Sequence, residues 1–286
     1  MKRYLAIILI GILGCLAAAE ASGQGQITTR REKLKDFTSR TTKVVLSGSE
    51  LQNEALRESV ASHWDLSPYE FCSFEEFNAL KTNPNYYFLL IVKERFRKES
   101  DPCINVLTLV KGGSGAGKSI DDMLEVVSFP LCSSDAPSGR ELILLPAFLE
   151  IIQDHTAGLT DTELKAYSGL GNYNKHIRAL KNRRIHFCEE DLAPQIGRKL
   201  TGSLDEDILL EDEDTVDEVF SRGTFNAVVS YVVAPEDPVN GSVCYKMLIG
   251  ADTHELYYFK KHRISARRGK GFLASDLKAI EGVRKR

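Results

Sequence analysis

One order of elements occurs twice along this 286-residue chain, and it constrains the fold more than any other feature. In each half, short apolar runs alternate first with helical segments and then follow one another as three strands before a closing helix. Strands that succeed one another through short turns pair as antiparallel hairpins, whereas strands separated by helices belong to mixed sheets. The order predicts an α/β (α+β) protein of two similar units. Each unit is expected to be a mixed β-sheet with an antiparallel three-strand meander and helices packed on one face.

The first half carries the clearer local signals. A capping box of Ser49 with Gln52 starts one expected helix, and a second box of Ser73 with Glu76 starts another. A longer helix is expected over 141–155, where Pro146 fits only in the first turn or at a kink. Period-two and apolar runs predict five strands, at 43–46, 69–72, 86–92, 104–110 and 124–131.

The second half is expected to repeat the plan. A helix over 161–180, interrupted by Gly169 and Gly171, precedes a strand at 184–188. Two short helical segments, 191–200 and 215–221, then lead to the meander and to a final helix. The meander strands are 225–234, 243–249 and 255–259, and the helix is 272–282. When the two halves are aligned, Phe71-Cys72 corresponds to Phe187-Cys188, which indicates an internal duplication.

The N-terminus has the layout of a secretory signal peptide. Lys2 and Arg3 are followed by the apolar run Leu5–Leu13 and then by small residues. Ala19-Glu20-Ala21 is the favoured cleavage site, and the alternative is a lipoprotein site that leaves a lipidated Cys15. The apolar run is shorter than the roughly 20 residues of a membrane-spanning helix. The chain is therefore expected to be exported, to the periplasm or the extracellular space, with lipid anchoring only through Cys15.

These features divide the chain into four parts. Residues 1–23 form the signal peptide, and 24–42, which are polar and basic, form a linker or flexible arm. The first α/β unit is expected over 43–158 and the second over 159–286.

Charge is nearly balanced overall but unevenly distributed. A net charge of −3 argues against nucleic acid or an anionic membrane surface as the main partner. Acidic residues crowd 205–218, whereas Lys and Arg are frequent from Lys260 to Arg286. The simpler interpretation is a solvated acidic loop with a frayed basic tail. Docking of one stretch on the other, or a calcium site, is the alternative, although no EF-hand spacing is present.

The cysteine pattern gives no metal or redox motif. Five cysteines follow the signal segment, an odd number, and none forms a C-x-x-C pair. Cys72 and Cys188 lie in apolar strands and are expected in the core. One disulfide among Cys103, Cys132 and Cys244 would suit an oxidising compartment.

Residues 112–119, Gly-Gly-Ser-Gly-Ala-Gly-Lys-Ser, match the phosphate-binding loop G-x-x-x-x-G-K-[ST]. Gly112, Gly117, Lys118 and Ser119 are thus the candidate nucleotide-binding residues. A working loop opens a helix, yet acidic and β-branched residues follow Ser119 and lead to Pro130. The compartment that an exported protein enters also contains no ATP pool. A glycine-rich hairpin tip is therefore the preferred interpretation, and no cofactor is expected.

Two histidines are the candidate metal ligands. His254 stands at an expected turn beside Asp252 and Glu255, although turn chemistry explains Asp252 and Thr253 more simply. His186 shares a strand face with Cys188 and Glu190, where a core role is simpler than zinc binding. The aromatic runs Tyr86-Tyr87-Phe88 and Tyr257-Tyr258-Phe259 form either core or a stacking surface, and core is preferred. No catalytic residue is assigned.

Several stretches resemble a family of exported Bacteroidetes proteins that has no assigned function. They are Trp64–Phe71, Tyr86–Leu90, Gly169–Tyr173, Cys244–Met247 and Ala251–Phe259. The resemblance covers most of the mature chain and implies a location in a Gram-negative cell envelope. It implies no catalytic residue.

The expected function is an exported cell-envelope binding or assembly module without catalytic activity. Its partner would be a protein, peptide or glycan of the envelope, with no nucleic acid, and with a membrane only through lipidated Cys15. The alternative is a nucleotide- or metal-dependent hydrolase that uses the 112–119 loop or the His254 turn. An envelope structural protein anchored through Cys15 is a third class.

Overall fold

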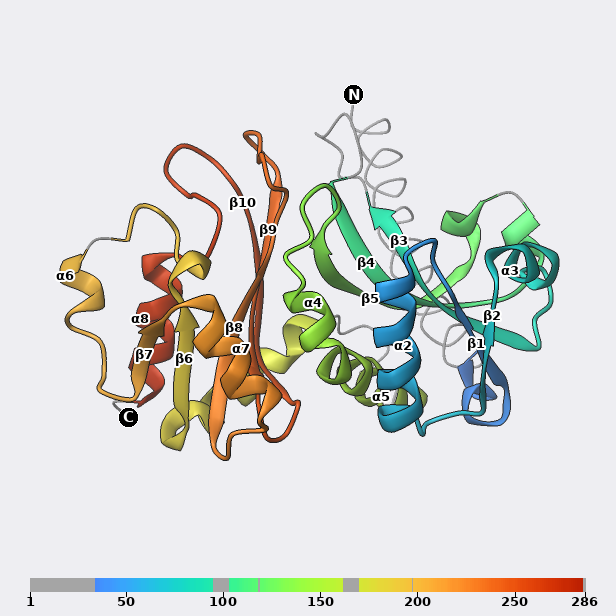
Figure 1. The fold of residues 1–286 in the computed structure, drawn as a ribbon, viewed down its shortest axis with the longest axis horizontal. Helices are drawn as coiled ribbons and strands as arrows, with labels where there is room; N and C mark the ends of the chain where they lie inside the picture. The colour runs from blue at the N-terminus through green and yellow to red at the C-terminus, as the bar shows by residue number, and fades with distance from the viewer. Residues whose placement is uncertain (1–33, 95–102, 118, 162–169, 197, 285–286) are drawn as a thin grey trace, which may run out of the picture.

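The structure is a computed structural model, and it describes residues 34–94, 103–117, 119–161, 170–196 and 198–284. Two separate five-stranded sheets lie side by side with helices between them and outside them (Figure 1). The predicted signal peptide, Cys15 and Lys118 lie outside the described residues. No helix within the described ranges is both long and apolar enough to cross a membrane.

The first sheet has the strand order β2-β1-β3-β4-β5. β1 pairs in parallel with β2 and with β3, and β3, β4 and β5 form an antiparallel meander. All five strands lie where the apolar runs predict them. Their bounds are β1 Thr41–Val45, β2 Tyr69–Cys72, β3 Tyr86–Glu94, β4 Ile104–Lys111 and β5 Leu124–Ser133.

The helices of the first unit begin at the expected caps. Ser49 accepts a hydrogen bond from the Gln52 amide, and Ser73 forms a complete capping box with Glu76. Pro146 is the second residue of its helix, where no intrahelical N–H is required. The segments are η1 Phe37–Ser39, α2 Glu50–His63, α3 Phe74–Leu80, α4 Arg140–Ile143 and α5 Leu145–Asp161.

The second sheet repeats the topology of the first, with the order β10-β9-β8-β6-β7. β6 pairs in parallel with β7 and β8, and β8, β9 and β10 are antiparallel. This confirms the predicted fold class of two similar mixed sheets. The strands are β6 Arg184–Cys188, β7 Ile208–Glu211, β8 Ala227–Val233, β9 Val243–Gly250 and β10 Leu256–Arg263.

The predicted correspondence between the halves is shifted by one strand. β6, which contains Phe187-Cys188, lies second from the edge of its sheet, as β1 does in the first sheet, so the counterpart of Phe187-Cys188 is Val44-Val45. Phe71-Cys72 of the edge strand β2 corresponds to Leu210-Glu211 of β7. β7 was not predicted, because this four-residue strand lies within the acidic stretch.

The helical segments of the second unit differ from the expected ones: residues 162–169 of the expected 161–180 helix lie outside the described residues, only short segments occur around 191–200, and the helix expected over 215–221 starts two residues earlier. The segments are η5 Leu170–Asn182, η6 Glu189–Asp191, α6 Arg198–Thr201, α7 Glu213–Ser221 and α8 Ala274–Arg284. η5 is a 3₁₀ helix, in which every third residue lies on one face. Ile177 and Leu180 face the core with this spacing, so a period of three replaces the expected α-helical period.

Helices cover both faces of each sheet, which corrects the expectation of one covered face. The inner faces share one hydrophobic cluster that includes Leu107 of β4, Phe148 of α5 and Met247 of β9. η5 and α8 cover the outer face of the second sheet around Phe187. α3 packs its Phe77 on the outer face of the first sheet. The two units therefore share a core, while their sheets remain distinct.

Residues 34–42 are packed, in contrast to the predicted flexible arm. Leu34 and Phe37 are fully buried, and the Phe37 ring lies 4.7 Å from that of Tyr87 in an edge-to-face arrangement. Asp36 forms an ion pair with Lys111 at 2.7 Å. Only these two apolar residues, Leu34 and Phe37, interrupt a polar segment, which is too few to establish a helical or strand period, so the sequence did not reveal this contact.

Candidate metal centre

Three side chains from three different elements meet where the two units face each other. Nδ1 of His63 lies 2.6 Å from Oε1 of Glu150, and Nδ1 of His254 lies 2.9 Å from the same oxygen. One ligand atom from each residue falls within 4.8 Å of the others. Within the described ranges, this is the only group of three His, Cys, Asp or Glu residues so arranged.

Each residue is held in place by its local structure. His63 ends α2, and α2 packs against α5, which carries Glu150. His254 lies in the β9–β10 turn with φ of +53°, a left-handed conformation that non-glycine residues adopt rarely. Its ring stacks on Phe220 of α7, with ring centroids 5.4 Å apart and planes 23° apart. The first unit thus supplies His63 and Glu150, and the second supplies His254.

The cluster is partly accessible to solvent. The side chains of His63, Glu150 and His254 are 29%, 35% and 20% exposed, respectively. An ion or a small ligand could therefore reach the histidines without opening the core.

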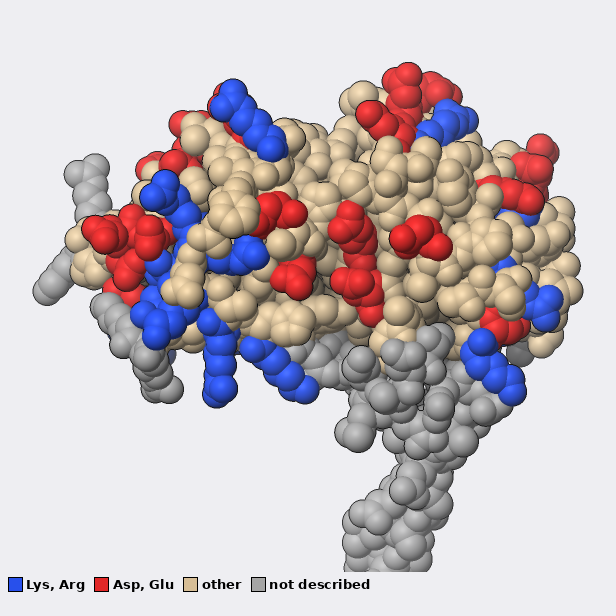
Figure 2. Space-filling view, turned by 90° about the horizontal axis from the view of Figure 1, so that it is seen from below, with Lys and Arg blue, Asp and Glu red and all other residues tan. Residues whose placement is uncertain are grey.

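Further carboxylates make the surroundings negative. Burial raises the pKa of Asp154, and the nearby charges of Glu150, Glu255 and Asp65 raise it further. Figure 2 shows acidic side chains grouped near the middle of the face seen from below. A negative field attracts cations, and an incoming cation would in turn lower the cost of ionising Asp154.

The ligand types fit a transition metal. Imidazole and carboxylate are the common ligands of zinc, and two histidines with one carboxylate leave one position open in a tetrahedral site. The same hydrogen bonds would also hold the three side chains together without an ion. A carboxylate that accepts both Nδ1–H groups is the ordinary arrangement of such a cluster.

The 112–119 loop joins the antiparallel strands β4 and β5, as the hairpin interpretation predicts. The amides of Gly112 and Gly113 donate to the carbonyls of Tyr86 and Lys81, so they are not free to bind phosphate. A Cβ on Gly112 would lie 2.2 Å from the Asn83 carbonyl oxygen. A three-residue 3₁₀ turn, Ile120–Asp122, follows Ser119 in place of the helix that phosphate binding requires. The close approach of the Asn83 backbone thus explains why residue 112 is a glycine.

The two predicted metal candidates have different environments. His254 does join a cluster, but its partners are His63 and Glu150 instead of Asp252 and Glu255. Nδ1 of His186 forms a hydrogen bond with Glu211 of β7 at 2.6 Å. The other two predicted members of the His186 group bond to each other, with the Cys188 thiol donating to Glu190. The structure therefore divides the predicted His186 group into separate pairs.

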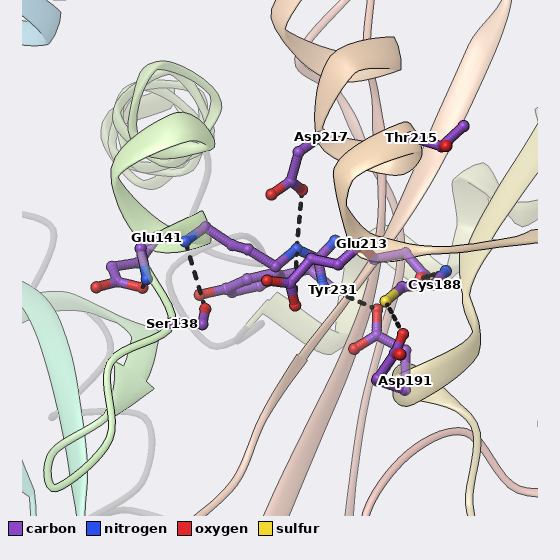
Figure 3. A network of polar contacts seen from close by, with 12 residues as sticks. Ser138, Glu141, Cys188, Asp191, Glu213, Thr215, Asp217 and Tyr231 are labelled. Atoms are coloured by element: carbon purple, nitrogen blue, oxygen red, sulfur yellow. Dashed lines mark hydrogen bonds and ion pairs between the residues drawn. The ribbon is translucent and has the colours of Figure 1, made fainter.

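A buried charged network crosses between the units (Figure 3). Arg140 of α4 binds Asp217 of α7 at 2.8 Å and lies 3.5 Å from Asp191. Its Nη2 also donates to the Ser230 carbonyl oxygen at 3.1 Å. Burial raises the pKa of Asp191, and Arg140 opposes that rise. These groups satisfy one another inside the protein, so we assign the network a structural role.

The acidic stretch that supplies Asp217 also meets the C-terminal helix. Arg284 of α8 forms ion pairs with Asp205 at 3.1 Å and with Asp207 at 2.7 Å. Docking of the basic C-terminus on the acidic stretch, the less favoured sequence interpretation, therefore occurs at Arg284.

Two of the cysteines and most of the two aromatic runs lie in the core, as the sequence predicts. All five described cysteines are free thiols, and Cys72 and Cys188 are buried as predicted. Burial raises the pKa of Cys188 to about 12, which makes it a poor nucleophile. Tyr87, Phe88, Tyr257 and Tyr258 are buried, which confirms the preferred core role of both aromatic runs.

Sequence reasoning missed His63 and Glu150. They lie 87 residues apart, and Glu150 is 104 residues from His254, so no spacing motif connects them. The available signal was a glutamate within the apolar run Ala147–Ile152, where a charged side chain needs a partner or solvent.

Comparison with known proteins gives no relative. No family model matches the sequence, no curated protein matches it, and no solved structure matches the fold. The resemblance to exported Bacteroidetes proteins stays a prediction, and the chemistry of the site rests on its geometry.

Proposed function

We propose that this chain is a binding module that holds a divalent transition-metal ion at the junction of its two units, and that this ion is Zn²⁺. One observation carries the proposal: imidazole nitrogens from both units converge on a single oxygen of Glu150, at 2.6 and 2.9 Å. The partly exposed position leaves room for a ligand from outside the chain. An imidazole or carboxylate of a protein or peptide partner would complete the coordination.

The proposal retains the expected export of the chain. With the predicted signal peptide, the site would lie in the cell envelope, and the partner would be another envelope component. The surrounding Asp65, Asp154 and Glu255 favour a cation over an anionic ligand.

Isothermal titration of the apo-protein with Zn²⁺ tests the proposal. We expect one ion per chain, and we expect His63→Ala, Glu150→Gln and His254→Ala each to weaken binding at least about tenfold, which is about 1.4 kcal/mol. His176→Ala is the matched control, because His176 is exposed and lies near Asp154, yet it is not one of the three cluster residues. Equal zinc affinity in the wild type and in all three cluster variants would show that the cluster is only a hydrogen-bonded contact.

A metal-dependent hydrolase is the second candidate, since an open position on a zinc ion can activate water. Asp154, whose pKa is raised by burial and by its neighbours, is the candidate base. Zinc-dependent turnover on a panel of ester and peptide substrates, abolished by Asp154→Asn while zinc affinity is retained, would favour this candidate over the binding module.

A further inference from the structure

η5 presents a row of cations on the surface of the second unit. Residues three apart in a 3₁₀ helix lie above one another, at a spacing of about 6 Å. Lys175, Arg178 and Lys181 have this spacing and are all exposed. None of the three has an ion-pair partner among the described residues. Figure 2 shows Lys and Arg side chains gathered on the half of this face that belongs to the second unit.

The row is held rigidly to the protein. The side chain of Asn174 bonds both the amide and the carbonyl of Phe259 in β10, at 2.9 and 2.7 Å. At the other end, Arg284 donates to the Leu180 carbonyl oxygen at 2.8 Å. These contacts fix which face of η5 points outward, so the three cations do not depend on a mobile loop for their arrangement.

An exposed aromatic ring lies next to the end of this row. Phe225 is 88% exposed, the largest exposure among the large apolar side chains that the structure describes. The side chain of the neighbouring Asn226 donates to the carbonyl of Asn182, the last residue of η5. The backbone amide of Asn226 donates to Asp252 at 2.9 Å. Gly223 and Asn226 both have φ near +58°, so the turn that carries Phe225 has a defined shape.

Three acidic groups of the second unit are already paired, whereas Asp154 of the first unit lies near His176 of η5. Asp252 binds Arg183 at 2.6 Å, Asp207 binds Arg284 at 2.7 Å, and Glu218 binds Arg222. These three acidic groups therefore do not neutralise Lys175, Arg178 and Lys181, although the whole chain has a net charge of −3. The net charge of the whole chain gave no indication of this local row of cations.

We propose that the η5 row and Phe225 form a docking surface for an anionic phospholipid bilayer. Lys and Arg near a bilayer are attracted to anionic headgroups, and an aromatic ring gains by entering the interface. A soluble polyanion would engage the cations but offers no apolar phase for Phe225. This contact is independent of a lipid on Cys15 and of the metal site.

Vesicle co-sedimentation tests this surface. The chain from residue 24 onward contains every described residue and lacks the apolar run Leu5–Leu13, which would bind vesicles by itself. We expect binding to vesicles of phosphatidylglycerol and phosphatidylcholine, little binding to phosphatidylcholine alone, and weaker binding as salt is raised. Lys175→Glu/Lys181→Glu and Phe225→Ser are each expected to lower the partition coefficient at least about threefold.

Matched controls separate this surface from charge and hydrophobicity in general. Arg57→Glu/Lys93→Glu changes the net charge by the same amount in the first unit, and Leu51→Ser removes an apolar side chain that is 68% exposed. Both controls should bind as the wild type does. Circular dichroism of all variants checks that they are folded.

Three outcomes would overturn the proposal. One is no binding to anionic vesicles at low salt. Another is equal loss in the control charge variant. The third is wild-type binding by Phe225→Ser together with displacement of the vesicles by single-stranded DNA or a sulfated polysaccharide, which would make the row a polyanion site.

Discussion

Nε of Arg140 in the first unit lies 2.8 Å from Oδ1 of Asp217 in the second, and the arginine side chain is almost fully buried. Tyr231 of β8 adds a second link, because its hydroxyl donates to the Leu131 carbonyl oxygen of β5 at 2.6 Å. The two units are thus joined through directional bonds as well as through their shared core. The candidate metal centre spans the same junction.

Removing the arginine should destabilise the whole protein. Arg140→Ala leaves the buried Asp191 and the half-buried Asp217 without their cation, and we expect the free energy of unfolding to fall by about 3–5 kcal/mol. Urea denaturation measures this. Arg222→Ala, which removes an exposed ion pair with Glu218, is the control and should cost no more than about 0.5 kcal/mol. A loss below about 1 kcal/mol for Arg140→Ala would show that water enters the junction and solvates the two carboxylates.

Asp276 should make stability depend on pH in the acid range. Burial opposes its ionisation, but hydrogen bonds from Lys246 and Tyr258 hold its pKa below the usual 3.8. A carboxyl with a lowered folded-state pKa contributes stability above about pH 4 and loses it as the pH falls through that pKa.

The variant Asp276→Asn isolates this contribution. At pH 7 we expect it to unfold about 3 kcal/mol more easily than the wild type, because buried Lys246 loses its counter-ion. The difference should narrow as the pH falls below 3.8, where the wild-type carboxyl becomes protonated as well. Urea titrations at several pH values measure it, and a difference that stays constant down to pH 3 would contradict this assignment.

The glycine-rich loop should respond to substitution as a hairpin and not as a nucleotide site. Gly112→Ala places a methyl group against the Asn83 carbonyl and should cost about 1–3 kcal/mol of stability. Gly113→Ala is the matched control, because its methyl group meets no atom within 4 Å. Thermal unfolding measures the stability of both variants. We expect ATP to leave the melting temperatures of the wild type and of Lys118→Ala unchanged. An ATP-dependent shift that Lys118→Ala abolishes would restore the phosphate-loop interpretation.

Local signals in the sequence predict most of the fold. Ser73 with Glu76 begins a helix where the capping box predicts it, and the apolar runs match nine of the ten strands, because each run is rich in apolar or aromatic residues and is not set among acidic ones. β7 is the exception, since four residues among aspartates and glutamates carry too little pattern to be recognised. Missing it shifted the alignment of the two halves.

The site was harder to predict because it depends on long-range packing. His254 was a candidate, but its turn neighbours Asp252 and Glu255 face other partners, Arg183 and Tyr257. Only the packing of α2 against α5, and of the two units against each other, brings His63 and Glu150 to it. The cationic row was hidden for a related reason: Lys175, Arg178 and Lys181 align only if the helix is 3₁₀.

Anomalous diffraction at the zinc edge, from crystals of the chain grown with Zn²⁺, tests the central claim most directly. The account predicts one strong peak at about 2.0–2.2 Å from a ring nitrogen of His63, a ring nitrogen of His254 and a carboxylate oxygen of Glu150. Crystals without a peak there, in which both imidazoles keep their hydrogen bonds to Glu150, would contradict it and would leave the cluster as a contact that joins the two units.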